Sequence, residues 1–351
     1  MKKKYISAPK TLKKLFPDCT FIGQNKIADS AKLFCCEIEN SQIFEDVELK
    51  DLIIKNSIIK KNNKKDLKNN IFSSEYFNFL KNYDSNFFDG IKILLCSEDM
   101  EVLDFATNLF KKLHAEVVCL NQNLSLETAS KSLQKTSFDI GFVFLERGDK
   151  ILALNPRGQV LDGDEILYLL AWHMLGQNAN GQFVVGTQKT NLGIENKLRA
   201  LGLSLKRINV NEGQFVAKFE ETGSALGATH CGLVLMKNTE FKNGLGVLAA
   251  RVLASVYLEN KNIWEKVKEN KYVQIEKKVD LGLFDRALPK EILKTFVNFY
   301  GLKLKSQGRV LIWQEGQKLK ILVESTEKTS AMILAIDIKR KIIRYLKSGG
   351  L

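Results

Sequence analysis

The sequence lacks any apolar run long enough to cross a membrane. Its most apolar stretches, residues 166–176 and 245–258, are shorter than the roughly 20 residues of a spanning helix, and the second contains Arg251. The basic N-terminus is followed by polar residues such as Ser7 and Lys10 rather than by the apolar segment of a secretory signal. We therefore expect a cytoplasmic protein without a membrane partner.

The cysteine patterns of a structural metal site are also missing. No CxxC pair and no zinc-ligand spacing occurs among the 6 cysteines, which are Cys19, Cys35, Cys36, Cys96, Cys119 and Cys231. We interpret them as small buried apolar residues in a reducing compartment.

Recognition motifs for nucleic acid are absent as well, although the charge is strongly positive. The chain has 53 Lys and Arg against 40 Asp and Glu, a formal net charge of +13. Such a charge attracts nucleic acid, acidic proteins and phosphorylated metabolites without distinguishing among them. Because the sequence has no zinc finger, RNP-like aromatic sequence or Arg-rich recognition helix, we do not expect nucleic acid as the partner.

What the sequence does contain begins with an N-terminal segment, residues 1–62. Between Ile22 and Ile59, aliphatic side chains recur every five to six residues. This spacing fits neither an amphipathic helix nor a simple hairpin, and it is typical of β-helix rungs. The segment loosely resembles the left-handed β-helix of sugar nucleotidyltransferases. A meander of short strands is the alternative.

Residues 63–88 open with a stretch rich in Lys and Asn and are predicted to be a linker. Beyond them, strands alternate with helices, which predicts an α/β layer with a mostly parallel sheet for residues 89–160. The expected strands are 91–96, 116–120 and 140–144, and the expected helices are 100–113 and 126–133.

A second α/β domain is predicted for residues 161–272, where either Asp162 or Asp164 can cap an apolar helix that ends near residue 175. The further strands expected here are 183–187, 205–209 and 232–236, and the helices are 191–201, 216–221 and 244–258. Residues 273–351 have an α+β pattern, with an early strand and helix, strands 309–313 and 320–324, and a final helix 329–345.

One segment imitates a cofactor motif. Gly244-Leu-Gly-Val-Leu-Ala249 is similar to a dinucleotide fingerprint, but no strand directly precedes it and no acid follows about 20 residues later at a strand end. We interpret it as a helix start capped by Asn243.

Several segments resemble one family in their order and spacing. The opening FVVGTQKTNLGIENKLRALG of residues 183–202 and the sequence DGDEI of residues 162–166 are similar to the third domain of phosphoglucosamine mutases and phosphomannomutases, the phosphohexomutase superfamily. The segment GATHCG of residues 227–232 occupies the place of the sugar-recognition loop of that family. The resemblance implies tandem α/β/α mutase-type domains over residues 89–272, followed by the small α+β domain.

Members of this family use four loops, and the resemblance allows each to be sought. The phosphoserine loop has a Ser-His-Asn-Pro type of sequence inside a complete α/β domain. This chain contains no such sequence, so we expect it to lack the first domain and the phosphoryl donor.

The magnesium loop of the family offers three carboxylates, which suit a hard cation. Here the loop is LERGDK, residues 145–150, with Leu145 and Arg147 in place of the first two ligands and Asp149 as the one remnant. We therefore expect neither a bound Mg²⁺ nor another cofactor, and the guanidinium of Arg147 can fill the space of the cation.

In the sugar loop, Thr229, His230 and Cys231 stand where the family has Glu, a polar residue and Ser. In the phosphate loop, Glu315 would repel a phosphate, and Lys318 and Lys320 can partly compensate. We predict no catalytic residues. The expected substrate-binding residues are Arg147, Lys150, Thr229, His230, Lys318 and Lys320.

These losses favour a catalytically degenerate mutase relative that binds a partner protein or a sugar phosphate in carbohydrate or cell-envelope precursor metabolism. A sugar nucleotidyltransferase or a complete mutase is the expected partner. Two alternatives stay open: an active phosphohexomutase, an intramolecular phosphotransferase completed by a partner chain, and a basic polyanion-binding module.

Overall fold

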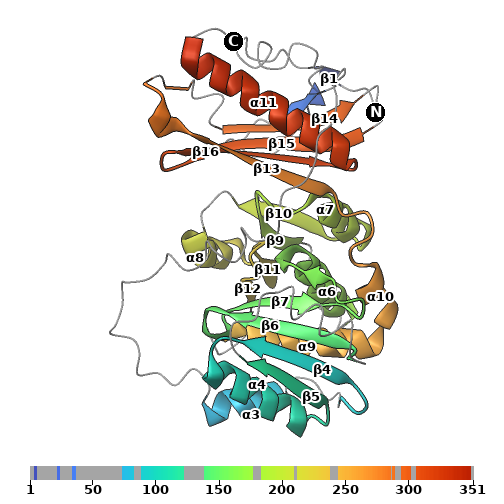
Figure 1. The fold of residues 1–351 in the computed structure, drawn as a ribbon. Coiled ribbons are helices and arrows are strands. Elements are labelled where there is room, and N and C mark those ends of the chain that lie inside the picture. Colours follow the sequence, from blue (N-terminus) through green and yellow to red (C-terminus); the bar gives the residue numbers. More distant parts are fainter. Residues whose placement is uncertain are drawn as a thin grey trace. The chain divides into compact units, whose positions relative to one another are not determined.

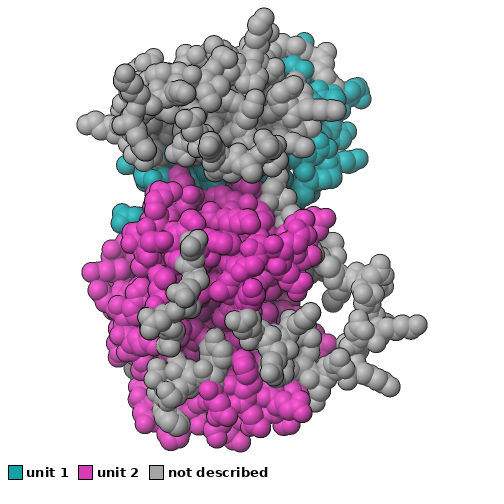
Figure 2. All heavy atoms as spheres, turned by 180° about the vertical axis from the view of Figure 1, so that it is seen from behind, with its two compact units in different colours: residues 1–60, 270–351 teal, residues 61–269 magenta. Residues whose placement is uncertain are grey.

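The computed structural model describes residues 73–82, 88–121, 138–176, 183–208, 212–237, 244–285, 287–288, 294–301 and 306–348, together with three short strands near the N-terminus (Figure 1). The chain forms two compact units, coloured in Figure 2. Unit 1 consists of residues 1–60 and 270–351, and unit 2 of residues 61–269.

Unit 2 contains a five-stranded sheet in the order β5 (Glu116–Asn121), β4 (Lys92–Ser97), β6 (Ile140–Leu145), β7 (Lys150–Leu154) and β8 (Val160–Leu161). The first three strands are parallel, as the alternation predicts, whereas β7 and β8 are antiparallel additions that the sequence reading missed. Helix α3 (Ser74–Asn82) and helix α4 (Met100–Lys112) belong to the same unit, and the carboxylate of Asp99 caps α4. The expected helix 126–133 lies outside the described residues.

The second sheet of unit 2 has the order β10 (Ser204–Ile208), β9 (Phe183–Thr187), β11 (Leu226–Ala228) and β12 (Val234–Met236). Its helices are α6 (Gly163–Gly176), α7 (Leu192–Ala200), α8 (Glu212–Thr222), α9 (Leu245–Glu259) and α10 (Lys261–Lys266). Buried residues of both sheets, such as Phe142 of β6 and Val185 of β9, belong to one hydrophobic core with α6 and α9. The predicted boundary between two α/β domains near residue 160 lies inside unit 2. It stays a prediction.

Helix α9 is packed closely against the loop after β6. A Cβ atom at Gly246 would lie 2.7 Å from the carbonyl oxygen of Gly148, so the helix backbone can approach this closely only with glycine there. Close packing against Gly148 therefore explains why the dinucleotide-like segment has glycine at position 246. The N-cap of α9 is Gly244, so the expected capping role of Asn243 is wrong.

In unit 1, helix α11 (Lys328–Ser348) packs on a seven-stranded sheet. The strand order is β1 (Lys4–Tyr5), β2 (Ile22–Gly23), β3 (Phe34–Cys36), β14 (Lys294–Gly301), β15 (Ser306–Glu315), β16 (Lys318–Ser325) and β13 (Val273–Asp280). Alternate strand residues such as Ile312 and Ile321 meet apolar residues of the helix such as Ala335 and Ile338. Apart from the 3₁₀ turn Leu281–Leu283, the described residues between β13 and β15 contain no helix where an early one was expected.

The β-helix prediction for the N-terminal segment falls mostly outside the described residues. Strands β2 and β3 pair with each other in antiparallel fashion, and β3 runs parallel to β14. Among the described residues, no helix is both long and apolar enough to span a membrane. Cys96 is buried as expected, whereas Cys119 on the edge strand β5 is exposed, which corrects its interpretation as a buried residue.

Candidate functional site

The loop between β6 and β7 reverses the chain through left-handed backbone. Three successive residues, Glu146, Arg147 and Gly148, have φ values of 48°, 58° and 82°. Glycine adopts such values freely, whereas they are costly for the other two residues. The turn is the segment that the resemblance aligns with the magnesium loop.

Asp149 ends this turn and holds the start of helix α9. Its Oδ1 accepts a hydrogen bond of 2.6 Å from the backbone N–H of Gly244, and the hydroxyl of Tyr76 donates to the carbonyl oxygen of the same glycine at 2.6 Å. Burial raises the pKa of Asp149 above its ordinary value, and Glu146 adds to this, against the opposing effects of the Gly244 N–H, Arg147 and Lys150. One of the two carboxylate oxygens of Asp149 is therefore already used in a hydrogen bond that stabilises the fold.

The two cations of the loop have different surroundings. Lys150 is 3% exposed, and its Nζ lies 2.8 Å from Oε1 of Glu146. The side chain of Arg147 is 49% exposed, with its guanidinium 3.7 Å from carboxylate oxygens of Asp99 and Glu101 at the start of α4. The buried cation of this loop is thus Lys150, and Arg147 extends toward the acids of α4.

Backbone hydrogen bonds join this loop to the segment around His230. The N–H of Ile151 donates to the carbonyl oxygen of Gly232 at 3.0 Å, and Lys150 forms a β-bridge with Leu233. The buried Thr229 closes a tight turn, because its carbonyl oxygen accepts the N–H of Gly232 at 3.0 Å. Four predicted site residues, Arg147, Lys150, Thr229 and His230, therefore belong to two segments linked through β7.

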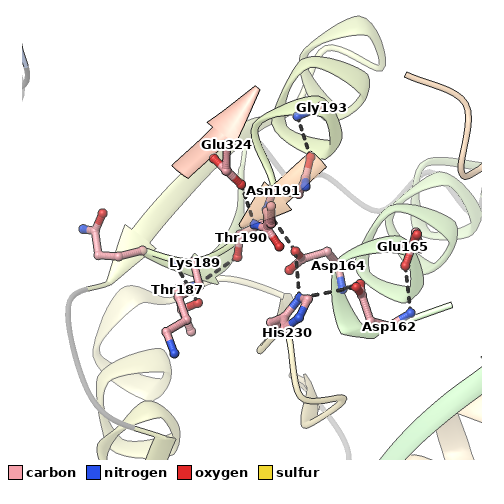
Figure 3. Close-up of polar contacts among 12 residues, drawn as sticks. Asp162, Asp164, Glu165, Thr187, Lys189, Thr190, Asn191, Gly193, His230 and Glu324 are labelled. Atoms are coloured by element: carbon pink, nitrogen blue, oxygen red, sulfur yellow. Dashed lines mark hydrogen bonds and ion pairs between the residues drawn. The ribbon is translucent and has the colours of Figure 1, made fainter. Parts of the chain in front are cut away.

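The imidazole of His230 lies beside two carboxylates at the start of helix α6 (Figure 3). Its Nδ1 is 3.3 Å from Oδ2 of Asp164 and 3.4 Å from Oδ2 of Asp162. Oδ2 of Asp164 also accepts the backbone N–H of Asn191 at 2.9 Å. The two aspartates, α7 and the expected sugar loop thus meet at one place.

The helix start at this place is a capping box. Oδ1 of Asp162 accepts the N–H of Asp164 at 3.0 Å, and Oε2 of Glu165 accepts the N–H of Asp162 at 2.7 Å. Asp162 is therefore the cap, and Asp164 turns its carboxylate toward Asn191 and His230.

The remaining predicted residues, Lys318 and Lys320, lie on β16 of unit 1, next to the tight turn at Gly316. The buried ammonium of Lys320 pairs with Oε2 of Glu315 at 2.5 Å and lies 3.8 Å from Oε1 of Glu276. Glu315, the residue expected to repel a phosphate, thus neutralises one of the two lysines expected to attract it.

Comparisons with known proteins identify the family. Residues 162–272 match the family model of the phosphoglucomutase/phosphomannomutase alpha/beta/alpha domain III. A phosphoglucosamine mutase of Vibrio cholerae is 28% identical over 268 residues, which are 72% of this chain and 60% of the relative. That of Hydrogenovibrio crunogenus is 31% identical over 261 residues, covering 69% and 57% of the two chains. The chain belongs to the phosphohexomutase superfamily.

A solved structure agrees with this assignment at the level of the fold. The X-ray structure of a phosphoglucomutase/phosphomannomutase family protein from Burkholderia thailandensis has a TM-score of 0.63 and 20% identity, covering 79% of this chain and 65% of its own. The chain spans about 60% of the length of the phosphoglucosamine mutase from Vibrio cholerae.

Some residues of this candidate site were not predicted from the sequence. Asp164 was considered only as a helix cap, and its contact with His230 joins residues 66 positions apart, for which no local pattern exists. The pairing of Lys150 with Glu146 joins residues only 4 positions apart, and a search for nearby opposite charges could have found it.

The role of Asp149 can be tested with two substitutions. Asp149→Ala should lower the free energy of unfolding by about 1–2 kcal/mol, because it leaves the N–H of Gly244 without its acceptor. Asp149→Asn keeps an oxygen at that place. Because the pKa of Asp149 is raised in the folded state, ionisation of the carboxyl costs stability above that pKa, and asparagine avoids this cost.

Urea unfolding at pH 7 should therefore rank the asparagine variant level with or above the wild type, and the alanine variant below both. Equal loss of stability in the two variants would contradict the assigned hydrogen bond.

Proposed function

We propose that this phosphohexomutase relative does not transfer phosphoryl groups and binds a sugar phosphate. The observation that carries the proposal is the arrangement of residues 145–150. Only Asp149 remains of three expected carboxylate ligands, and its Oδ1 accepts the N–H of Gly244. The ammonium of Lys150 is buried beside Glu146 in the same turn.

The side chains of this turn do not suit a magnesium ion. Mg²⁺ requires near-octahedral oxygen ligands and gives up its water reluctantly. The single carboxylate of Asp149, whose Oδ1 already accepts a hydrogen bond, is therefore a poor site for this ion. Lys150 and Arg147 supply no oxygen ligands, and each already lies near a carboxylate of the chain, Lys150 at 2.8 Å from Glu146 and Arg147 at 3.7 Å from Asp99. Without the ion, the charge that develops during phosphoryl transfer loses its main source of stabilisation.

Arg147 is the side chain of this loop best suited to an anionic ligand. Its side chain is 49% exposed, and its planar guanidinium suits a phosphate, which would compete with the carboxylates of Asp99 and Glu101. The segment from Thr229 to His230, joined to this loop through β7, supplies polar groups within the same unit. The names of the relatives make a hexosamine phosphate the first ligand to test.

Titration calorimetry of the full chain with glucosamine 6-phosphate tests this proposal. Binding should be the same in EDTA and in magnesium, because the ligand is held by the protein alone. Arg147→Gln should weaken it by about fivefold or more, as expected for the loss of roughly 1 kcal/mol or more from a charge-assisted hydrogen bond.

Arg340→Gln is the matched control, since Arg340 is an exposed arginine on α11. Binding that requires magnesium would contradict the proposal and favour an active mutase. If no sugar phosphate binds, a partner protein becomes the better proposal, with a sugar nucleotidyltransferase or a complete mutase as the first to test.

A further inference from the structure

The cluster of Asp162, Asp164 and His230 has the chemistry of a metal-binding site. One ligand atom from each of the three side chains lies within 4.8 Å of the other two. Two of the ligands flank Gly163 at the start of α6, and the third comes from the segment before β12. The cluster is separate from the loop 145–150 that the resemblance aligns with the magnesium site.

Two of the three separations between the ligand atoms fit a small transition-metal ion. Nδ1 of His230 is 3.3 Å from Oδ2 of Asp164 and 3.4 Å from Oδ2 of Asp162. Tetrahedral Zn²⁺, with bonds of about 2.0–2.2 Å to nitrogen and oxygen, separates its ligand atoms by about 3.3–3.6 Å. One imidazole with two carboxylates favours zinc or a similar ion over magnesium, which prefers oxygen alone.

The buried carboxylate of Asp164 also favours a metal ion at this cluster. The residue is 0% exposed, and its Oδ2 accepts a hydrogen bond from the N–H of Asn191 and lies 3.3 Å from Nδ1 of His230, an atom that binds a metal in its deprotonated form. Its Oδ1 is buried too, and within the described part of the chain no hydrogen-bond donor reaches that atom. A buried carboxylate is expensive unless positive charge and hydrogen bonds compensate it, and a metal ion beside it supplies both a charge and a bond to oxygen.

The surrounding structure holds the ligands in place. The capping box fixes the backbone of Asp162, and the N–H of Asn191 orients Asp164. The N–H of Gly163 donates to the carbonyl oxygen of His230 at 3.1 Å, which ties the third ligand to the same helix start. Such outer contacts are typical of metal sites, where they orient the ligands.

We propose that Asp162, Asp164 and His230 bind one divalent transition-metal ion of the zinc class. The ion joins the start of α6, the cap of α7 at Asn191 and the segment before β12. It stabilises the position of His230 in the expected sugar loop, and it takes no part in phosphoryl transfer.

The experiment uses the full chain after removal of metal with EDTA and dialysis. Titration with Zn²⁺ should give saturable binding of about one ion per chain, and Co²⁺ should give the visible absorption of a four-coordinate site. His230→Gln and Asp162→Asn should each weaken Zn²⁺ binding by about tenfold or more, since each removes or weakens one of the three protein ligands.

His173→Gln is the control variant. His173 lies outside the cluster, with its Nδ1 3.3 Å from Oε2 of Glu259, and its substitution should leave zinc binding unchanged. Far-UV circular dichroism verifies that each variant is folded. Absence of saturable binding in the wild type, or equal binding in His230→Gln and the wild type, would overturn the proposal and leave a hydrogen-bonded cluster. No sugar phosphate is present in this titration, so its outcome is independent of the proposed function.

Discussion

Gly163→Ala should destabilise unit 2 by roughly 3 kcal/mol or more, one of the largest effects of a single methyl group in this chain. A Cβ atom built at Gly163 would lie 1.9 Å from the carbonyl oxygen of Thr229 and 2.9 Å from the nitrogen of Gly232. Both are backbone atoms, which cannot turn aside as the end of a flexible side chain can. The helix start and the expected sugar loop would have to separate, and the contact between Asp164 and His230 would be lost with them.

Gly176→Ala is the matched control because Gly176 ends the same helix. A Cβ atom there would meet no atom within 4 Å, so alanine should be neutral or stabilising by up to about 1 kcal/mol. Urea unfolding followed by tryptophan fluorescence measures both variants. Similar stability of the two would show that the approach of α6 to the loop is not as close as the structure has it.

The second large effect is expected at a buried ion pair of unit 1. Arg309 on β15 and Glu324 on β16 are directly opposite each other on neighbouring antiparallel strands, and their side chains pair through Nε and Oε2. Glu324 is 0% and Arg309 6% exposed, and the side-chain amide of Gln274 also donates to the glutamate. Glu324→Ala should cost about 3–5 kcal/mol, because it leaves a buried guanidinium without its carboxylate.

The double variant Arg309→Met with Glu324→Leu should recover most of this loss, since apolar residues of similar volume often replace a buried ion pair without penalty. Asp337→Ala serves as the control. It removes a partly exposed pair with Lys341 on α11, at 2.9 Å, and should change the stability by less than about 1 kcal/mol. Chemical denaturation of the four proteins would contradict the account if both single variants lost the same stability.

This ion pair also bears on the phosphate loop. The resemblance places Arg309 at the start of the strand that leads to the loop, where an arginine would suit an anion. In the structure its Nε is paired with Glu324, and Lys320 is paired with Glu315. Arg309 and Lys320 thus face carboxylates of the same chain.

The parts of the fold that could be predicted from the sequence are those with local signals. Strand β9 begins and ends at the predicted residues. Helix α7 begins where Asn191 offers a cap and an apolar face begins. The antiparallel strand β7 was missed because its pairing depends on the left-handed turn at Glu146 and Arg147, and these residue types give no sign of such a backbone. Strand β14 was not predicted, although it pairs along its whole length with β15.

The candidate site was predictable only in part. The losses at Leu145 and Arg147 follow from the resemblance alone. The burial of Lys150, the bond from Gly244 to Asp149 and the contact of His230 with Asp164 depend on packing between segments distant in sequence. A sequence pattern shows which residues are present in a loop, but it does not show which of them form hydrogen bonds or ion pairs within the folded chain.

The central claim is that this chain retains a phosphohexomutase scaffold without the chemistry. The most direct measurement is phosphorus NMR of glucosamine 6-phosphate incubated with the full chain, magnesium and a hexose 1,6-bisphosphate. The account predicts no conversion to the 1-phosphate beyond that in a protein-free sample. Magnesium-dependent conversion that is lost in Asp149→Asn would contradict it.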